Sequence, residues 1–298
     1  MPELPEVEIT ARRLAAALAG AEVESALARG MVALKSVKPP LDALVGRPVE
    51  GVRRIGKMPI VEFGPPDARL RLRSGGVTEG RPLDLLVHLM SAGRLQLFDK
   101  RASLRDRASR VLIRLADGRE LRLREFGTRQ RAWAKLMPEG EVANDEMVAT
   151  LGPEAWPAPP LPELERALDQ PRHLHPLLRD QRTIAGIGRS WVDEILWEAR
   201  LSPFKKGSEL KGDEVERLYD GLAVLGSALD HYEQVIADTV PDKLPMPLRI
   251  HRREGEPCPR CGTRIEAVYF AEHQTNYCPK EQTGGRVLKD RRLSRLLK

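Results

Sequence analysis

The sequence predicts an α+β protein of more than one domain, with a β-rich first half, a helical second half and a small cysteine-bearing module. Three observations support this division. Residues from about 31 to 135 contain short segments in which apolar and polar residues alternate, as in strands. Beyond about residue 166, apolar residues recur three and four positions apart, as in helices. All three cysteines fall between positions 258 and 278.

Length and composition indicate a globular protein with room for two hydrophobic cores. The chain has 298 residues, of which 41% are hydrophobic. No apolar run approaches the length that crosses a bilayer, and the acidic opening does not resemble a secretion signal. An odd number of clustered cysteines is poor material for a disulfide framework. We therefore expect a cytoplasmic protein without membrane contact.

The first element is the opening segment MPELPEVEIT, whose prolines have two interpretations. Pro5 suits the first turn of a helix, glutamates there complement the helix dipole, and apolar residues follow at helical spacing up to Gly20. Alternatively, removal of Met1 leaves Pro2 with a free secondary amine, less basic than lysine because α-amino groups titrate near about pH 8. Such an amine can attack an aldehyde carbon and form an iminium. The first ten residues alone favour the helix-start interpretation.

The next segments, ARLRLRSGG, LDLLVHLM, GRLQLFD and SRVLIRLADGRELRLREFG, predict the strands of a β-sandwich. In the last of them, Asp117-Gly118 is a hairpin signal. Alternate positions on the two sides of that turn are apolar: Val111, Ile113, Leu115, Leu121 and Leu123.

Basic residues point to a polyanionic partner. The net charge is +6, arginines crowd residues 101 to 131, and the final stretch GGRVLKDRRLSRLLK is strongly basic. Lys57 follows Gly56, and Arg124 stands two residues before Phe126. A basic residue near an aromatic one can grip phosphate and enter a base stack, although solvated charge and core packing are the commoner roles of such residues.

The second half begins after a segment rich in Pro and Glu, residues 137–165, which predicts a linker. We expect an N-terminal domain over 1–136, a helical domain over 166–247 and a cysteine-bearing module with a basic tail over 248–298. In the helical domain, Gly186 and Gly188 separate two helical patterns, the second starting near Ser190. Glycines there permit a tight turn whose amides can hold a phosphate, or simply join two helices.

The stretch CPRCGTRIEAVYFAEHQTNYCPKEQ predicts a zinc site. Cys258 and Cys261 form a CxxC pair, and Cys278 follows at the spacing of a zinc ribbon. Glu281 stands where a fourth cysteine is expected. Three possibilities remain: the cysteines with Glu281, the cysteines with His273, or a metal-free module held by packing. We favour one structural zinc.

Seven motifs occur in a shared order: PELPEVE at the start, GK at 56–57, HLMSAGRL at 88–95, REFG at 124–127, LGPE at 151–154, DQRTIAGIG followed by DE, and GEPCPRCG. In this order they resemble the formamidopyrimidine-DNA glycosylase and endonuclease VIII family from end to end. The resemblance implies a bifunctional DNA glycosylase and abasic-site lyase of base excision repair, a bacterial-type monomer acting on damaged double-stranded DNA of the nucleoid. It implies a β-sandwich with flanking helices, a helix-two-turn-helix domain and a zinc-finger β-hairpin.

The resemblance also implies catalytic roles. Pro2 attacks C1′ of the damaged nucleotide, expels the base and leaves an iminium that drives β-elimination and then δ-elimination of the phosphates. Glu3 is the neighbouring acid and base, Glu6 supports the site, and Lys57 holds a phosphate beside the lesion.

Arg124 and Phe126 match the family's residues that fill the space left by a flipped base. The family's third such residue, a methionine, stands one position beyond Met90, so either Met90 in a shifted loop or the small Ser91 takes that place.

Two further DNA contacts depart from the family's usual sequence. Beside Gly188, the family has asparagine where this chain has Arg189, which can also bind phosphate. The family's finger arginine falls at His273, and Arg286 is the candidate that replaces it.

Lesion preference rests on the segment HYEQVIADTVPDKLPMPLRIHRREGEPC, residues 231–258. Family members that prefer 8-oxoguanine carry a longer loop here, rich in glycine and aromatic residues. The shorter segment leads us to expect oxidised pyrimidines and abasic sites as substrates. The alternatives are a glycosylase specific for 8-oxoguanine or formamidopyrimidine, a catalytically weak damaged-DNA-binding relative, and a ribosomal or topoisomerase-type protein that shares only the glycine turn.

Overall fold

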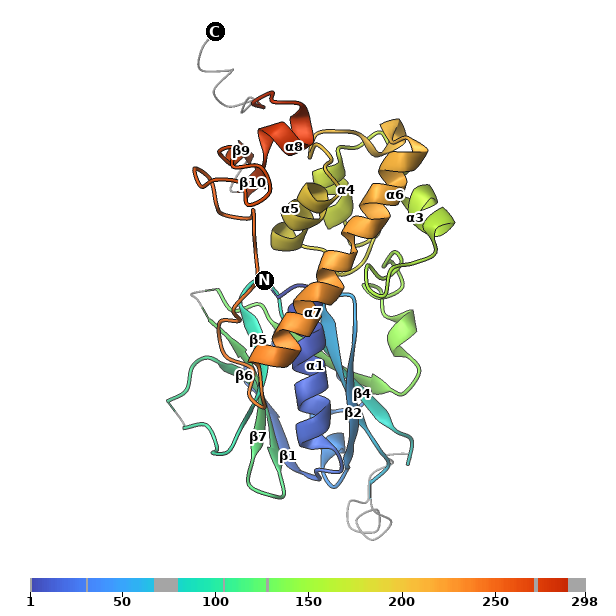
Figure 1. Ribbon diagram of the computed structural model, residues 1–298. Helices are drawn as coiled ribbons and strands as arrows, with labels where there is room; N and C mark the ends of the chain where they lie inside the picture. The colour runs from blue at the N-terminus through green and yellow to red at the C-terminus, as the bar shows by residue number, and fades with distance from the viewer. Residues whose placement is uncertain are drawn as a thin grey trace. The chain divides into compact units, whose positions relative to one another are not determined.

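The computed structural model describes residues 2–30, 32–66, 80–103, 105–126, 129–270 and 273–288, with backbone alone at Phe270 and His273. The chain forms two compact units (Figure 1). The first comprises Met1–Thr150 and Tyr232–Leu244, and the second Leu151–His231 and Pro245–Lys298. The expected strand ARLRLRSGG lies within 67–79, outside the described residues. No helix among the described residues is long and apolar enough to span a membrane.

The first unit is a β-sandwich with a helix, which confirms the fold class predicted for this half. One antiparallel sheet has the order β1-β6-β7-β5 and the other β2-β3-β4-β8. The strands are β1 (Val23–Ala28), β2 (Val49–Ile55), β3 (Met58–Phe63), β4 (Leu83–His88), β5 (Gly93–Phe98), β6 (Ser109–Leu115), β7 (Glu120–Glu125) and β8 (Trp133–Pro138). Short 3₁₀ helices lie at η1 (Leu41–Leu44) and η2 (Val142–Asn144).

The hairpin predicted at Asp117-Gly118 joins β6 to β7. Gly118 has φ 93°, a conformation that costs glycine little, and Ile113 pairs with Leu121 across the turn. The alternation therefore places the apolar side chains of both strands on one face, toward the core.

Helix α1 (Leu4–Leu18) closes the sandwich core and brings the start of the chain to it. Val7, Ala11, Leu14 and Leu18, spaced at one face of a helix, are buried among strand residues of both sheets. Each fully buried leucine or valine contributes roughly 1.5–3 kcal/mol relative to exposure. The apolar face thus fixes the helix, and with it the residues at its N-terminus.

The second unit is helical and ends in the cysteine-bearing module. Its elements are α3 (Leu161–Leu168), α4 (Leu174–Arg179), α5 (Arg189–Glu198), η3 (Gly207–Glu209), α6 (Gly212–Gly221), α7 (Ala223–Val235), β9 (Glu266–Phe270), β10 (His273–Tyr277) and α8 (Pro279–Thr283). Helix α7 extends past His231, so its last residues belong to the first unit. The hairpin β9-β10 is antiparallel, with Tyr277 opposite Glu266.

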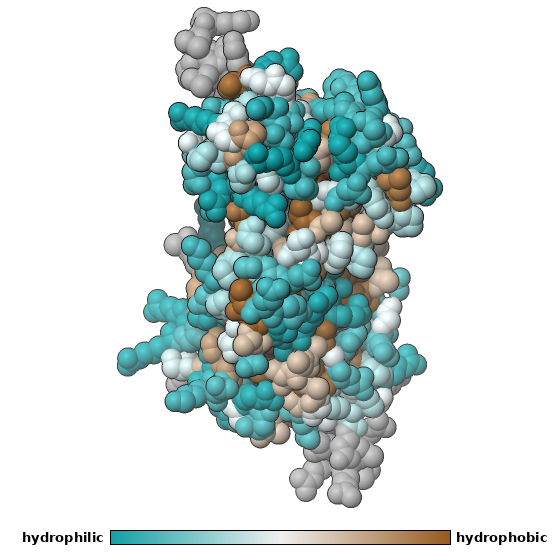
Figure 2. Space-filling model, viewed as in Figure 1, coloured by the Kyte–Doolittle hydropathy of each residue, from teal (hydrophilic) through white to brown (hydrophobic). Residues whose placement is uncertain are grey.

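The segment expected to be a linker, 137–165, is divided between the two units at Thr150. It contains the end of β8 and the start of α3, and its buried apolar side chains include Met137, Val142, Val148, Ala155 and Leu164. These buried side chains anchor each half of the segment in its own unit. The high Pro and Glu content did not indicate this burial. On the face drawn in Figure 2, apolar residues lie in small separate groups among hydrophilic ones.

Candidate active site and nucleic-acid interface

Pro2 and Glu3 immediately precede α1. The candidate nucleophile therefore lies next to the N-terminus of this helix. Oε2 of Glu6 accepts a 2.9 Å hydrogen bond from the backbone N–H of Glu3, as in a capping box. Glu3 is 2% exposed and Glu6 3% exposed. The helix-start interpretation is confirmed, and the start of this helix holds two buried carboxylates within four residues of Pro2.

Tyr232 supplies the second support of Glu6. Its hydroxyl donates a 2.7 Å hydrogen bond to Oε1 of Glu6. Burial and the nearby negative charge of Glu6 raise the pKa of Tyr232, so the phenol keeps its proton at physiological pH. Glu6 is thus held through both oxygens. Sequence reasoning missed Tyr232, because nothing local in α7 marks a partner 226 positions away.

Lys57 lies in the turn between β2 and β3. Gly56, at φ 53°, lets the chain reverse there. Arg54 donates to the carbonyl oxygen of Gly56 at 3.2 Å, and its Nε lies 2.8 Å from Oε2 of Glu8 in α1. The turn that carries Lys57 is therefore tied to the helix that carries Pro2, Glu3 and Glu6.

His88, at the end of β4, binds the backbone of the loop that follows it. Burial, with a further contribution from the charge of Lys57, lowers the pKa of His88. Neutral Nδ1 can then accept the 3.1 Å hydrogen bond from the backbone N–H of Met90. Met90 has φ 49° and packs partly buried against the core, while Ser91 is exposed. The loop therefore turns Met90 inward and presents Ser91 to solvent.

Arg124 and Phe126 lie next to that loop. The backbone N–H of Phe126 points to the carbonyl oxygen of Ala92 at 3.5 Å, and the Phe126 ring is 37% exposed. The Arg124 guanidinium stands 4.7 Å from the centre of the Phe126 ring. The structure thus brings Arg124 and Phe126 together, and the backbone of Phe126 lies beside the loop that carries Met90.

Asp242, which the sequence did not single out, holds Arg124 in place. Its Oδ1 accepts hydrogen bonds from Nη1 of Arg124 at 3.1 Å and from Nε2 of Gln96 at 3.0 Å. Its carbonyl oxygen accepts a 2.9 Å bond from Arg94, and Gln96 also donates to the carbonyl oxygen of Val240. The segment after α7 is therefore bound to β5 and β7 by several hydrogen bonds.

In the second unit, the glycine turn is braced by one side chain. Gln181 accepts from the N–H of Gly186 at 3.0 Å and donates to the carbonyl oxygen of Ile187 at 2.9 Å. Gly186 has φ 100°, and Gly188 is the N-cap of α5. The first residue of that helix, Arg189, is exposed. The turn therefore presents helix-start amides and a guanidinium, both suited to an anion such as phosphate.

The three cysteines form the metal site. Among the described residues, Sγ of Cys258, Cys261 and Cys278 lie within 4.8 Å of one another. A tetrahedral zinc with Zn–S bonds of about 2.3 Å places its sulfurs about 3.8 Å apart, so the donor set fits the ion. The cluster therefore fits the predicted structural zinc, with Cys258, Cys261 and Cys278 as its candidate sulfur ligands.

Among the described side chains, the metal-binding group contains the three cysteines and does not include Glu281. Oε2 of Glu281 lies 3.4 Å from Nε of Arg200 and 3.5 Å from Nη1 of Arg260. Arg286 is exposed just after α8. His273 begins β10, and its side chain lies outside the described part of the structure.

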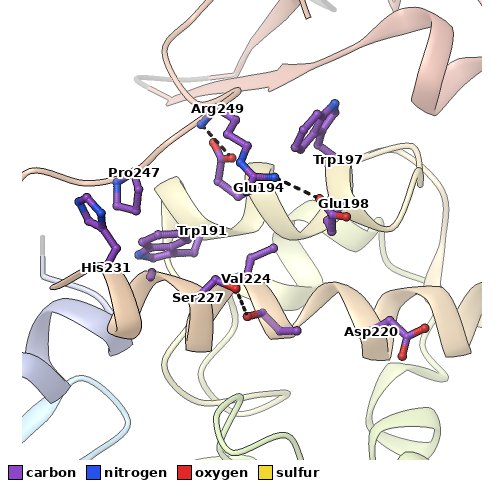
Figure 3. A pocket seen from close by; sticks show the side chains of 12 residues that line it. Trp191, Glu194, Trp197, Glu198, Asp220, Val224, Ser227, His231, Pro247 and Arg249 are labelled. Atoms are coloured by element: carbon purple, nitrogen blue, oxygen red, sulfur yellow. Dashed lines mark hydrogen bonds and ion pairs between the residues drawn. The ribbon is translucent and has the colours of Figure 1, made fainter. Parts of the chain in front are cut away.

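A separate hollow of about 410 Å³ lies within the second unit (Figure 3). Residues of α5, α6, α7 and the segment around Pro247 line it, and Trp191 and Trp197 stand toward its two ends. Above it, Arg249 pairs with Glu198 at 3.7 Å. None of the sequence-predicted site residues is among its lining residues.

Comparison with known proteins identifies three domains in the same order. Residues 1–130 match the formamidopyrimidine-DNA glycosylase N-terminal domain, 151–239 the H2TH domain of that enzyme, and 255–280 the zinc finger found in FPG and IleRS. Fold and site therefore define a zinc-finger DNA glycosylase of the helix-two-turn-helix class.

Individual relatives agree over the whole chain. The formamidopyrimidine-DNA glycosylase of Roseiflexus sp. (strain RS-1) is 34% identical over 300 residues, covering 95% of this chain and all of the relative. That of Bacillus anthracis is 30% identical over 296 residues, covering 94% and 98%. The chain belongs to the formamidopyrimidine-DNA glycosylase family, whose members are base excision repair glycosylases with abasic-site lyase activity.

Solved structures show the same fold. Wild-type Lactococcus lactis Fpg (MutM), in a complex with DNA containing N7-benzyl-Fapy-dG, superposes with a TM-score of 0.79 at 25% identity, covering 95% of this chain and all of that one. MutM from Thermus thermophilus gives a TM-score of 0.75 at 29% identity, covering 94% and 98%.

Proposed function

We propose that Pro2, freed of Met1, is the nucleophile of a combined glycosylase and lyase reaction on damaged double-stranded DNA. The observation that carries this proposal is the position of Pro2 beside two buried carboxylates. An α-amino group titrates near about pH 8, so part of the Pro2 amine is uncharged and nucleophilic near neutral pH.

The proposed reaction begins at the damaged nucleotide. The Pro2 nitrogen bonds to C1′ while the glycosidic bond breaks, and the base leaves with a proton. The amine nitrogen then loses its proton and O4′ gains one, so the C1′–O4′ bond breaks, the sugar ring opens and an iminium forms between Pro2 and C1′. The iminium acidifies the C2′ hydrogen, so that base-assisted elimination expels the 3′ phosphate and a second elimination expels the 5′ phosphate. Water then releases Pro2 and the sugar fragment.

Glu3 is the group we assign to proton transfer. It adjoins Pro2, is nearly fully buried and lies one turn from Glu6, whose two oxygens are already engaged by Glu3 N–H and Tyr232. Lys57, carried by the turn tied to α1, supplies a cation for a phosphate near the lesion. Arg189 and the α5 start, together with Arg286 of the finger, are proposed phosphate contacts.

Within this class we propose a preference for oxidised pyrimidines and abasic sites. The supporting observation is the segment after α7, which Asp242 and Val240 bind to β5 and β7. A segment engaged in this way is poorly suited to fold over a flipped purine. The name shared by the relatives favours a second candidate, a glycosylase for formamidopyrimidine lesions. We further propose that the enzyme acts as a monomer on cytoplasmic DNA.

Trapping tests the nucleophile. Borohydride added to the protein and an abasic duplex is expected to give a covalent adduct that Pro2→Gly loses. Glu3→Gln is expected to reduce base removal by roughly 10²–10⁴-fold, the usual contribution of a proton-transfer group, with duplex affinity retained. Glu22 is exposed just before β1 and lies outside the proposed site, so Glu22→Gln is the matched control. An undiminished adduct in Pro2→Gly would exclude the mechanism.

Single-turnover rates test the lesion preference. Matched duplexes carry 8-oxoguanine opposite C, formamidopyrimidine, thymine glycol, dihydrouracil or an abasic site. Faster cleavage of thymine glycol and dihydrouracil supports the proposal. Cleavage of 8-oxoguanine or formamidopyrimidine at least as fast as either pyrimidine refutes it in favour of the purine-derived lesions.

A further inference from the structure

The zinc site of this chain provides three sulfur ligands where a structural zinc has four protein ligands. Zinc in closed structural sites is tetrahedral, while sites with three protein ligands keep a fourth position for water or another molecule. Among the described residues, the candidate ligand group comprises Cys258, Cys261 and Cys278. The candidates for a fourth protein ligand are Glu281, which occupies the sequence position of the missing cysteine, and His273, whose side chain lies outside the described part of the structure.

Glu281 is engaged by two guanidinium groups. Its Oε2 lies 3.4 Å from Nε of Arg200 and 3.5 Å from Nη1 of Arg260, and its side chain is only 13% exposed. Arg200 is 61% exposed, but Arg260 is only 22% exposed, so separation of Glu281 from Arg260 is costly because a partly buried charge loses its partner without regaining full hydration. Movement of Glu281 to the metal would have to break these contacts.

Arg260 is itself fixed in place, so it does not follow a moving carboxylate. Its Nη2 lies 2.9 Å from Oε2 of Glu198, and Nη1 donates to the carbonyl oxygen of Trp197 at 3.1 Å. Its guanidinium also stacks 4.0 Å from the centre of a Trp197 ring. Arg260 lies within the CxxC loop, so these contacts anchor one side of the metal site to α5.

We propose that the finger binds zinc through the three thiolates alone and leaves the fourth position open to a small donor from solution. Water fills it by default, and a low-molecular-weight thiol replaces water where one is present. Three thiolates and Zn²⁺ carry a net charge of −1, which the two nearby arginines offset. Cys261 is only partly buried, unlike Cys258 and Cys278, so its side is the route of approach.

Cobalt(II) can replace zinc to report the occupant of the fourth position, since the absorption of cobalt(II) depends on the number of its sulfur ligands. The full-length protein, purified without thiol and loaded with cobalt(II), is titrated with 2-mercaptoethanol. We expect a saturable increase of roughly one third in the sulfur-to-cobalt charge-transfer band, because four sulfurs replace three. Glu281→Gln is expected to respond in the same way, and Glu281→Cys to show the higher absorption from the start and no response.

Protein ligation at the fourth position gives the opposite pattern. If wild type does not respond to 2-mercaptoethanol but Glu281→Gln or His273→Ala does, the substituted residue is the fourth ligand and the proposal is wrong. Loss of the cobalt spectrum on thiol addition, in wild type and Glu281→Cys alike, also overturns it, because the thiol then strips the metal. Glu281→Gln decides the question even if Glu281→Cys fails to fold. None of these readouts depends on glycosylase activity.

Discussion

The hydroxyl of Tyr232 donates to Oε1 of Glu6 at 2.7 Å, which joins the last turn of α7 to the first turn of α1. Oε2 of the same carboxylate accepts the N–H of Glu3. The residue expected to transfer protons is therefore positioned by a carboxylate that is itself positioned by a phenol. These two hydrogen bonds make the position of Glu3 depend on Tyr232, which lies 226 positions from Glu6 in the sequence.

Tyr232→Phe is expected to lower the free energy of unfolding by roughly 1.5–3 kcal/mol, the usual contribution of a hydrogen bond to a charged group. Single-turnover base removal should fall as well, because Glu6 then holds Glu3 less firmly. Urea unfolding and rate measurements check both, with Tyr219→Phe in α6 as the control. Equal effects of the two substitutions would show that Tyr232 has no special role.

The raised pKa of Tyr232 also predicts a pH dependence. An unfolded tyrosine loses its proton near about pH 10, whereas the folded one keeps it. The stabilisation is therefore complete below about pH 10 and is lost as pH rises toward the folded pKa. Unfolding free energies between about pH 9 and pH 11 should decline more steeply for wild type than for Tyr232→Phe, and parallel curves would contradict the assignment.

The lowered pKa of His88 predicts a free energy of unfolding that falls as the pH falls, opposite in sign to the dependence predicted for Tyr232. Burial lowers its pKa, so the contribution of neutral His88 is complete above about pH 6.5 and is lost as pH falls through the folded pKa. Protonated Nδ1 cannot accept the N–H of Met90, so the loop should loosen on acidification. Urea unfolding from about pH 7.5 to pH 5 should show a smaller loss in His88→Gln than in wild type. His173→Gln, in the second unit, should keep the wild-type slope.

Asp242→Asn is expected to tighten binding of damaged duplex by up to about fivefold. Asp242 is 56% exposed, and an exposed ion pair contributes about 0–1 kcal/mol, so its loss frees Arg124 at little cost in stability. Asp238→Asn, an exposed aspartate of the same segment, removes an equal charge and serves as the matched control. Dissociation constants for damaged duplex, measured at fixed salt, compare the two variants. Equal increases in affinity would show that only the change in net charge matters.

Cys258→Ser is expected to abolish stoichiometric zinc and to unfold the finger, since metal binding and folding of such modules are coupled. Metal analysis of protein purified without chelator should give about one zinc per chain for wild type and much less for the variant. Trp197 shares a hydrophobic cluster with Cys258 and Cys278, so tryptophan fluorescence should change along with the metal content. A variant that retains zinc would remove Cys258 from the ligand set.

Sequence reasoning succeeded where the determining interactions are local. The helix after Pro2 and the hairpin at Asp117-Gly118 follow from capping, spacing and turn chemistry within a few residues. The shared order of motifs also led to the family. The partners of Glu6 and Arg124 could not be found this way, because Tyr232 and Asp242 are more than 100 positions distant and occupy unremarkable sequence.

Residues Tyr232–Leu244 belong to the first unit, although they are synthesised after most of the second unit. The first unit is therefore completed late in translation. A ribosome finishes α1 and both sheets of the sandwich long before it reaches Tyr232. Until then Glu6 lacks its phenol donor, and Arg124 lacks the carboxylate of Asp242. The helix-two-turn-helix segment is translated in between, so the contacts of Glu6 and Arg124 are completed only after most of that domain has been synthesised. An N-terminal fragment ending at Thr150 would likewise be an incomplete enzyme, and the two units are best produced as one polypeptide.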